Sequence, residues 1–255
     1  MDHIRVHKHP EGVLAIAIDR PERRNALSAA MYEALSAAVE AGEADAEVRV
    51  LLLHGAAGNF TSGNDIADFR QPAGSWPSPG MRFLQTVAAA RKPLLAAVEG
   101  YAVGIGTTML LHCDAVYAGA TARFRLPFVN LGLCPEGASS YLLPRLAGYK
   151  EAARLLLFGD EFDAATAQAA GIVTEQTPEG RALERALERA AVLAHKAPEA
   201  LRVTKALLRR GDARAVEDTL LYEAQCFARC RESAEAQEAF AAFFEKRPAD
   251  FSRIK

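Results

Sequence analysis

Residues 98–108 read Val98-Glu99-Gly100-Tyr101-Ala102-Val103-Gly104-Ile105-Gly106-Thr107-Thr108. They pass from an apolar, strand-like run through a glycine-rich turn into the start of a helix. The first turn of a helix leaves backbone N–H groups without partners, and the helix dipole favours negative charge there. Gly104 and Gly106 permit a tight turn and a close approach of a ligand to the backbone. The segment therefore suits a developing oxyanion, although a plain connection between strand and helix is the favoured explanation when it is taken alone.

A second turn of the same kind lies at Asn59-Phe60-Thr61-Ser62-Gly63-Asn64-Asp65-Ile66. It follows the continuous apolar run 48–54, which is typical of a strand buried on both faces, and it precedes a short predicted helix at 65–69. Asp65 is a candidate N-cap of that helix, which is a structural role. Two such turns, each after a buried strand, favour one convergent oxyanion site built from backbone N–H groups.

A glutamate in an apolar setting marks the third motif, Leu131-Gly132-Leu133-Cys134-Pro135-Glu136-Gly137-Ala138-Ser139-Ser140-Tyr141. Burial would raise the pKa of Glu136 towards neutrality, as a base that removes a proton from carbon requires. The alternative is that Glu136 is a first-turn helix residue favoured by the helix dipole. Composition leaves both explanations open.

The segments around these motifs alternate between predicted strands and helices. Strands are expected at 3–7, 13–19, 48–54, 94–98 and 115–118, with helices after Ser28, up to Arg91 and at 107–112. This alternation predicts an α/β architecture with parallel strands. From about residue 136 we expect helices only, at 179–196, 199–210 and 213–247, with Asp163 as an N-cap and Gly171 just past a helix end. We therefore predict a core domain at 1–197 and a helical region at 198–255.

Composition and charge exclude several classes of protein. The net charge of −2 gives no basic field for nucleic acid, no apolar run reaches the length of a membrane span, and the start of the chain lacks the apolar segment of a signal peptide. A cytoplasmic location is therefore expected. Four cysteines are too few for a disulfide scaffold, and Cys226 and Cys230 are expected to be ordinary helix-face residues. The histidines are scattered, so no metal site is predicted. Met109 replaces the third glycine of a dinucleotide-binding fingerprint, and no Gly-x-Ser-x-Gly motif of hydrolases occurs.

Together the motifs resemble those of the crotonase family, the enoyl-CoA hydratase/isomerase superfamily, over about residues 13–244. The most specific matches are Arg20-Pro21-Glu22-Arg23-Arg24-Asn25-Ala26-Leu27, Ser62-Gly63-Asn64-Asp65, Gly100-Tyr101-Ala102-Val103-Gly104-Ile105-Gly106 and His112-Cys113-Asp114. The resemblance implies a crotonase spiral of repeated ββα units, in the α/β class. It also implies that residues 198–255 form a helical region that assembles the chain into a homotrimer or hexamer.

The resemblance further implies the substrate and the residues that bind it. The substrate is an acyl-CoA thioester of fatty acid metabolism, as in β-oxidation, with coenzyme A as part of the substrate and no separate cofactor. The backbone N–H groups of Asn64 and Ile105 form the oxyanion hole, although most relatives have glycine in place of Ile105. Arg23 and Arg24 meet the phosphates and adenine of coenzyme A. The other residues expected around the substrate are Ser62, Asp65, Ile66, Gly104 and Phe128. Trp76, in the proline-rich loop 71–80, is either a lid over the acyl chain or, as we prefer, a loop anchor.

Departures from the family pattern point to a subfamily. A typical hydratase has two glutamates that activate water, and these would fall at Thr108 and Phe128, neither of which is acidic. The segment Pro135–Ser140, together with Ser62–Asp65, resembles the peroxisomal type of Δ3,Δ2-enoyl-CoA isomerase, in which the glutamate matching Glu136 is the catalytic base. An isomerase is therefore expected. The alternatives are an enoyl-CoA hydratase and a protein that binds CoA thioesters with little catalysis.

Overall fold

The structure is a computed structural model that describes residues 3–70 and 76–254. Part of the predicted loop at 71–80, namely 71–75, lies outside the described residues. Trp76 is 58% exposed, and Pro79 already begins helix α2 (Pro79–Ala89).

A six-stranded sheet dominates the described part of the chain, in the order β1-β2-β3-β4-β6-β9. Its strands are β1 (Ile4–Lys8), β2 (Val13–Ile18), β3 (Val50–Gly55), β4 (Leu94–Val98), β6 (Ala115–Gly119) and β9 (Glu175–Thr177). β1 is antiparallel to β2, and all the other pairs are parallel. This confirms the predicted α/β architecture with parallel strands.

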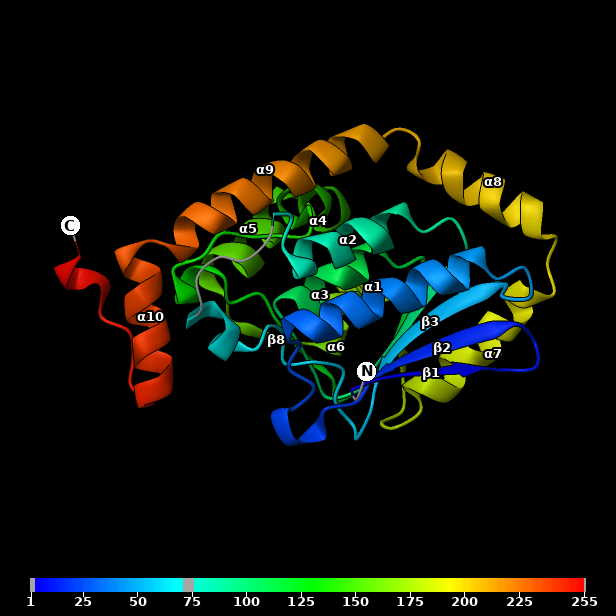
Figure 1. Ribbon diagram of the computed structural model, residues 1–255, viewed down its shortest axis with the longest axis horizontal. Coiled ribbons are helices and arrows are strands. Elements are labelled where there is room, and N and C mark those ends of the chain that lie inside the picture. The colour runs from blue at the N-terminus through cyan, green and yellow to red at the C-terminus, as the bar shows by residue number, and fades with distance from the viewer. Residues whose placement is uncertain (1–2, 71–75, 255) are drawn as a thin grey trace.

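Helices cover both faces of this sheet, which explains why β2 and β4 are buried along their whole length. Leu51 and Leu53 of β3 point into the larger core with helix α1 (Ala29–Ala44), whereas Leu52 faces helix α7 (Ala182–Ala194). Figure 1 shows α1 and α7 on opposite sides of β1, β2 and β3. The continuous apolar run in β3 therefore follows from burial on both faces.

A smaller sheet positions the glycine-rich turns. It contains β5 (Tyr101–Val103), β7 (Arg123–Arg125) and β8 (Glu161–Asp163), in the order β5-β7-β8. Thr61 forms a parallel bridge with Ala102 of β5, and Asn64 forms another with Leu27. Backbone pairing thus continues from β5 through both predicted turns.

The remaining helices follow the predicted positions with three corrections. They are α3 (Ile105–Thr108), α4 (Ser139–Ala147), α5 (Tyr149–Phe158), α6 (Ala164–Ala169), α8 (Pro198–Arg209), α9 (Ala213–Arg231) and α10 (Ala234–Glu245), with short 3-10 turns η1 (Pro21–Arg23), η2 (Ile66–Arg70), η3 (Met109–His112), η4 (Val129–Leu131) and η5 (Phe251–Arg253).

The expectation of helices only after residue 136 is wrong, because β8 and β9 lie there. Both strands are three residues long, too short for a hydrophobic alternation to be recognised. The helix expected at 213–247 is two helices, since the Ser233 hydroxyl accepts a hydrogen bond from the backbone N–H of Ala236 and starts α10. The helix expected at 107–112 begins at Ile105 and ends as a 3-10 turn.

Two predicted helix signals are confirmed. The Asp163 side chain accepts a hydrogen bond from the backbone N–H of Thr166 and caps α6. Gly171 follows α6 with a φ of +75°, the left-handed conformation typical of the position after a helix end.

The C-terminal helices follow one another around the outside of the molecule: α9 passes over α2 and α4, with α8 at one end and α10 at the other (Figure 1). The predicted domain boundary at 197/198 stays a prediction. Within residues 3–70 and 76–254, no helix is long and apolar enough to cross a membrane.

Candidate active site

The two glycine-rich turns lie directly against each other. The backbone N–H of Thr61 donates to the Tyr101 carbonyl at 2.9 Å, and that of Val103 donates to the Thr61 carbonyl at 3.1 Å. A Cβ atom at Gly63 would lie 2.6 Å from the carbonyl oxygen of Val103, so only glycine allows this approach. The predicted convergence of the turns is therefore present.

Backbone N–H groups without acceptors lie at this junction. Among the described residues, the N–H groups of Asn64 and Ile105 have no hydrogen-bond partner. Ile105 opens α3, where an N–H lacks an intrahelical acceptor. Gly104 has φ +57° and ψ −120°, a conformation suited to glycine, and no atom lies within 4 Å of the place its Cβ would take. Open space therefore lies beside the donors.

Side-chain contacts fix the turn that carries Asn64. The Tyr32 hydroxyl donates to Asn64 Oδ1 at 2.7 Å, and Tyr32 is buried. Arg20 Nη1 pairs with Asp65 Oδ2 at 2.9 Å, while Asp65 Oδ1 accepts from the N–H of Ala67 at 3.1 Å. Asp65 therefore has the predicted capping role and, in addition, an ion pair.

Asn25 joins η1 to the turn at residues 61–64 from inside the protein. Its side chain is fully buried and donates to the carbonyls of Ala56 and Asn59, and its own carbonyl accepts from the Thr61 hydroxyl at 2.6 Å. This places η1 next to the turn.

Glu136 lies partly buried at the start of the segment that leads into α4. The Thr108 hydroxyl, at the end of α3, donates to Glu136 Oε1 at 2.6 Å. Burial raises the pKa of Glu136 to about 8, the charge of Glu223 adds to the rise, and the Thr108 hydrogen bond opposes it. The carboxyl group is therefore a base of near-neutral pKa held by the same short helix that presents the Ile105 N–H.

Two titratable groups near Glu136, Tyr32 and His112, are uncharged at pH 7. Burial and then the Glu136 charge raise the pKa of Tyr32, so its phenol stays neutral at pH 7. Burial also lowers the pKa of His112 to about 4, so its imidazole is neutral as well. Neither group competes with Glu136 as the ionised base.

The other predicted site residues lie around the turns in different ways. Arg23 and Arg24 are exposed on and after η1, and their carbonyls accept hydrogen bonds from the side chain and the backbone N–H of Ser62, respectively. Ile66 begins η2 and packs on the core. The side chains of Ile105 and Phe128 are buried in that same core, which places the Ile105 side chain away from solvent.

Four residues of this arrangement were not predicted: Tyr32, Thr108 as a hydrogen-bond donor, His112 as a buried donor, and Glu223. They come from segments far apart along the chain, and nothing local in their sequence signals the contact. The ion pair between Arg20 and Asp65 is likewise visible only in the fold.

Comparison with known proteins places this geometry in a family. The family model described as enoyl-CoA hydratase/isomerase matches residues 8–253. A curated relative, 2,3-dehydroadipyl-CoA hydratase of Escherichia coli, is 34% identical over 241 residues, which are 94% of each chain. Enoyl-CoA delta isomerase 2 of Rattus norvegicus is 35% identical over 208 residues, 79% of this chain and 53% of that protein.

A solved structure shares the whole fold. The crystal structure of an enoyl-CoA hydratase/isomerase from Pseudoalteromonas atlantica has a TM-score of 0.93 at 40% sequence identity, covering 98% of this chain and 99% of that chain. With the motifs at 20–27, 62–65 and 100–106 folded around one site, the chain is a crotonase-fold enzyme that acts on acyl-CoA and belongs to the enoyl-CoA hydratase/isomerase family.

Proposed function

We propose that this enzyme is a Δ3,Δ2-enoyl-CoA isomerase in which Glu136 carries the proton. One observation carries the proposal: a partly buried glutamate with a pKa of about 8 is hydrogen-bonded to Thr108, on the helix whose first N–H faces open space. A base of this pKa suits removal of a proton from carbon near neutral pH.

The proposed reaction has two proton transfers. The thioester carbonyl oxygen accepts hydrogen bonds from the N–H groups of Asn64 and Ile105. Glu136 takes a proton from C2, and the electron pair of that C–H bond delocalises over the carbonyl oxygen and the C3=C4 bond as a dienolate. Glu136 then returns the same proton to C4, and the double bond moves to C2=C3. In other enzymes, loss of one such oxyanion donor costs about 3 kcal/mol of transition-state stabilisation.

The identity of residues 108 and 128 supports isomerisation over hydration. The positions at which we expect the two water-activating glutamates of a hydratase hold Thr108 and Phe128. Thr108 donates to Glu136, and Phe128 is 4% exposed within the apolar core. Isomerisation needs one carboxylate and no water, which fits this set of side chains.

Hydration of a 2-enoyl-CoA is the second candidate. It is favoured by the Escherichia coli relative, whose name is that of a hydratase and which aligns over 94% of each chain. In that case Glu136 would activate water alone.

The test compares two substrates with the purified protein. A 3-enoyl-CoA is supplied while the ultraviolet absorbance of the conjugated thioester is followed, and a 2-enoyl-CoA is supplied in parallel. We expect the conjugated product to form from the first substrate and the second to remain unchanged. Rapid loss of the 2-enoyl absorbance with no isomerisation would reject the isomerase and favour the hydratase.

The Glu136→Gln variant tests the assigned base. We expect loss of turnover by at least two orders of magnitude with binding of a saturated acyl-CoA retained, because a general base contributes about 10²–10⁴-fold. Turnover that persists undiminished would show that another group removes the proton. A wild-type protein that binds acyl-CoA but converts neither substrate would be a binding protein.

We also propose that coenzyme A lies along Arg23 and Arg24 and that the chain assembles as a homotrimer or a hexamer of two trimers. The arginines are exposed beside the turn at residues 61–64.

The proposal of assembly rests on exposed apolar surface. Large apolar side chains are exposed on α8 and α9, among them Leu208 at 80% and Tyr222 at 66%, which is costly in a monomer. Light scattering of the wild type and of Leu208→Glu tests the assembly: we expect a trimer or hexamer that the charge weakens, and a monomeric wild type would contradict it.

A further inference from the structure

A second buried glutamate, Glu223, reaches the catalytic segment from α9. Glu223 is 5% exposed. Its carboxylate accepts hydrogen bonds from the N–H of Ala138 at 2.6 Å, the N–H of Ser140 at 2.9 Å and the Ser140 hydroxyl. No arginine or lysine of the described residues forms an ion pair with it. Backbone N–H groups at the start of α4 therefore compensate its charge.

These hydrogen bonds hold a segment that needs support. Ala138 has φ +54° and ψ +21°, a left-handed conformation that is strained for a non-glycine residue. No side chain of its own segment caps α4. The cap comes instead from Glu223, which lies 85 positions after Ala138 in the chain.

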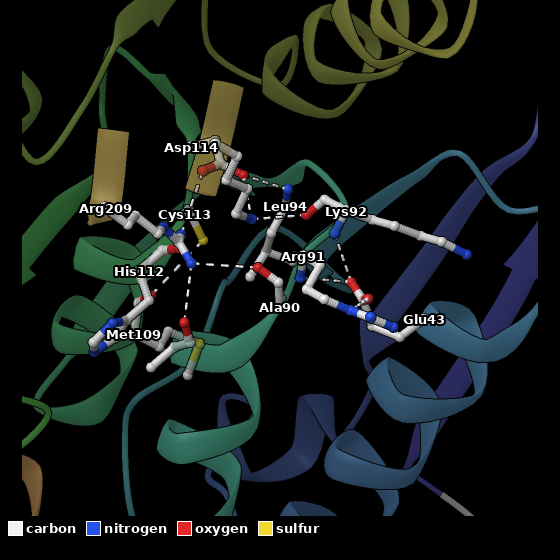
Figure 2. Close-up of polar contacts among 12 residues, drawn as sticks. Glu43, Ala90, Arg91, Lys92, Leu94, Met109, His112, Cys113, Asp114 and Arg209 are labelled. Carbon is white, nitrogen blue, oxygen red and sulfur yellow. Dashed lines mark hydrogen bonds and ion pairs between the residues drawn. The ribbon is translucent and has the colours of Figure 1, made fainter. Parts of the chain in front are cut away.

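The opposite side of the segment is held by His112. Its Nε2 donates to the Gly137 carbonyl at 2.9 Å, and its own carbonyl accepts from Arg209 Nη2 at 2.6 Å. Figure 2 shows Arg209 reaching from α8 towards His112, Ala90 and Asp114. The backbone at Gly137 and Ala138, next to Glu136, is thus held from two directions. Glu223 of α9 accepts from the N–H of Ala138, and His112, which is itself bonded to Arg209 of α8, donates to the carbonyl of Gly137.

We propose that Glu223 is a positioning residue, which holds the 138–140 backbone so that the Glu136 carboxylate faces the substrate carbon. The proposal rests on the proposed role of Glu136 and goes beyond it, because Glu223 lies in the C-terminal helical region and acts through the backbone at 138–140. Catalytic geometry at Glu136 then depends on the docking of α9.

The charge of Glu223 also acts on Glu136. The groups near Glu136 are Thr108 of α3, Tyr32 of α1, His112 of η3 and Glu223 of α9. Burial is the main cause of the raised pKa of Glu136, and among these neighbours the charge of Glu223 adds to it, because Tyr32 and His112 are neutral at pH 7. Burial also raises the pKa of Glu223, while the hydrogen bonds from Ser140 and Ala138 oppose that rise. Removing the charge of Glu223 is therefore expected to move the titration of Glu136 to lower pH, whereas the positioning role is read from kcat against KM.

The experiment uses two variants and one control of the full-length protein. Glu223→Gln removes the charge and sets an NH2 group against a backbone N–H. Glu223→Asp keeps the charge but withdraws the carboxylate by one methylene group. Glu217→Gln, an exposed glutamate of the same helix, is the matched control.

Two readouts are compared: kcat and KM for the reaction that the wild type catalyses, and the pH titration of the Glu136 carboxyl band by infrared difference spectroscopy against Glu136→Gln. We expect both Glu223 variants to lower kcat about tenfold or more with little change in KM, because misplaced catalytic groups lose rate steeply. The Glu136 titration shifts to lower pH in Glu223→Gln and stays near that of the wild type in Glu223→Asp. Glu217→Gln matches the wild type in both.

The proposal is overturned if either Glu223 variant folds, as judged by circular dichroism and assembly state, and retains the wild-type kcat. An unshifted Glu136 titration in Glu223→Gln would contradict the effect of the Glu223 charge. If Glu223→Gln does not fold, Glu223→Asp decides through its kcat. Because the infrared titration needs no turnover, a shift in Glu223→Gln, found while the wild type fails to isomerise 3-enoyl-CoA, would reject the proposed function and keep the interaction between Glu223 and Glu136.

Discussion

Glu136→Gln changes the stability of this enzyme as well as its activity. The folded protein keeps a carboxyl group where burial opposes its charge, so ionising Glu136 costs folding free energy. Glutamine has nearly the same shape, and its Oε1 can still accept the hydrogen bond from the Thr108 hydroxyl. The substitution therefore removes the cost of the charge while leaving the packing in place.

The magnitude follows from the two pKa values. In the unfolded chain Glu136 titrates near 4.5, and in the folded protein near 8. Between these values the unfolded state has released a proton that the folded state still binds, so the free energy of unfolding falls as pH rises through this window and levels off above it. At about 1.4 kcal/mol per pKa unit, the cost of the carboxylate is about 1 kcal/mol at pH 5 and about 5 kcal/mol at pH 9. We expect the stability advantage of Glu136→Gln over the wild type to grow by about 4 kcal/mol between these pH values.

Urea unfolding of both proteins at pH 5, 7 and 9, at one protein concentration, measures this difference. The constant concentration matters because assembly couples stability to mass action. A difference between variant and wild type that stays constant with pH would refute the reasoning, since it would place the folded-state pKa of Glu136 near its ordinary value.

Three further predictions concern catalysis. In the proposed reaction the ionised form of Glu136 is the base, so kcat/KM for 3-enoyl-CoA is expected to rise with pH with an apparent pKa near 8; a profile flat from pH 6 to 9 would contradict this. Thr108→Val removes the hydrogen bond that lowers the pKa of Glu136, so the rising limb of the same profile moves to higher pH and the rate at pH 7 falls; an unchanged limb would argue against this contact. Gly63→Ala places a Cβ 2.6 Å from the Val103 carbonyl and separates the two turns, with an expected loss of kcat of about 100-fold, whereas the control Gly58→Ala has a similar positive φ with open space around it and keeps kcat.

The sequence motifs predicted the two glycine-rich turns and their convergence, and the physical reason is local. Gly63 and Gly104 each sit beside the residue whose N–H is left without an acceptor, so turn and donor are encoded within a few positions. The apolar runs at β3 and β4 likewise identify strands buried on both faces. Local patterns of this kind need no knowledge of the rest of the chain.

The part of the site that could not be predicted depends on contacts between distant segments. Glu223 reads as one acidic residue of a helix, and only the packing of α9 on α4 shows that it caps the catalytic segment. His112 reads as a helix residue until its Nε2 is seen on the Gly137 carbonyl. β9 contains no hydrophobic alternation, and it is a strand because the edge of β6 offers it hydrogen-bond partners.

The hydrogen bonds that Glu223 of α9 and Arg209 of α8 make around residues 136–140 and His112 have a consequence for biosynthesis. Translation proceeds from the N-terminus, so Glu136 is synthesised before Arg209 and Glu223. The nascent protein can complete its large sheet as far as β9 while the left-handed turn at Ala138 still lacks its cap. The cap of the turn at Ala138 is therefore among the last of these contacts that can form, and we expect a chain that ends before Glu223 to leave this turn without its cap.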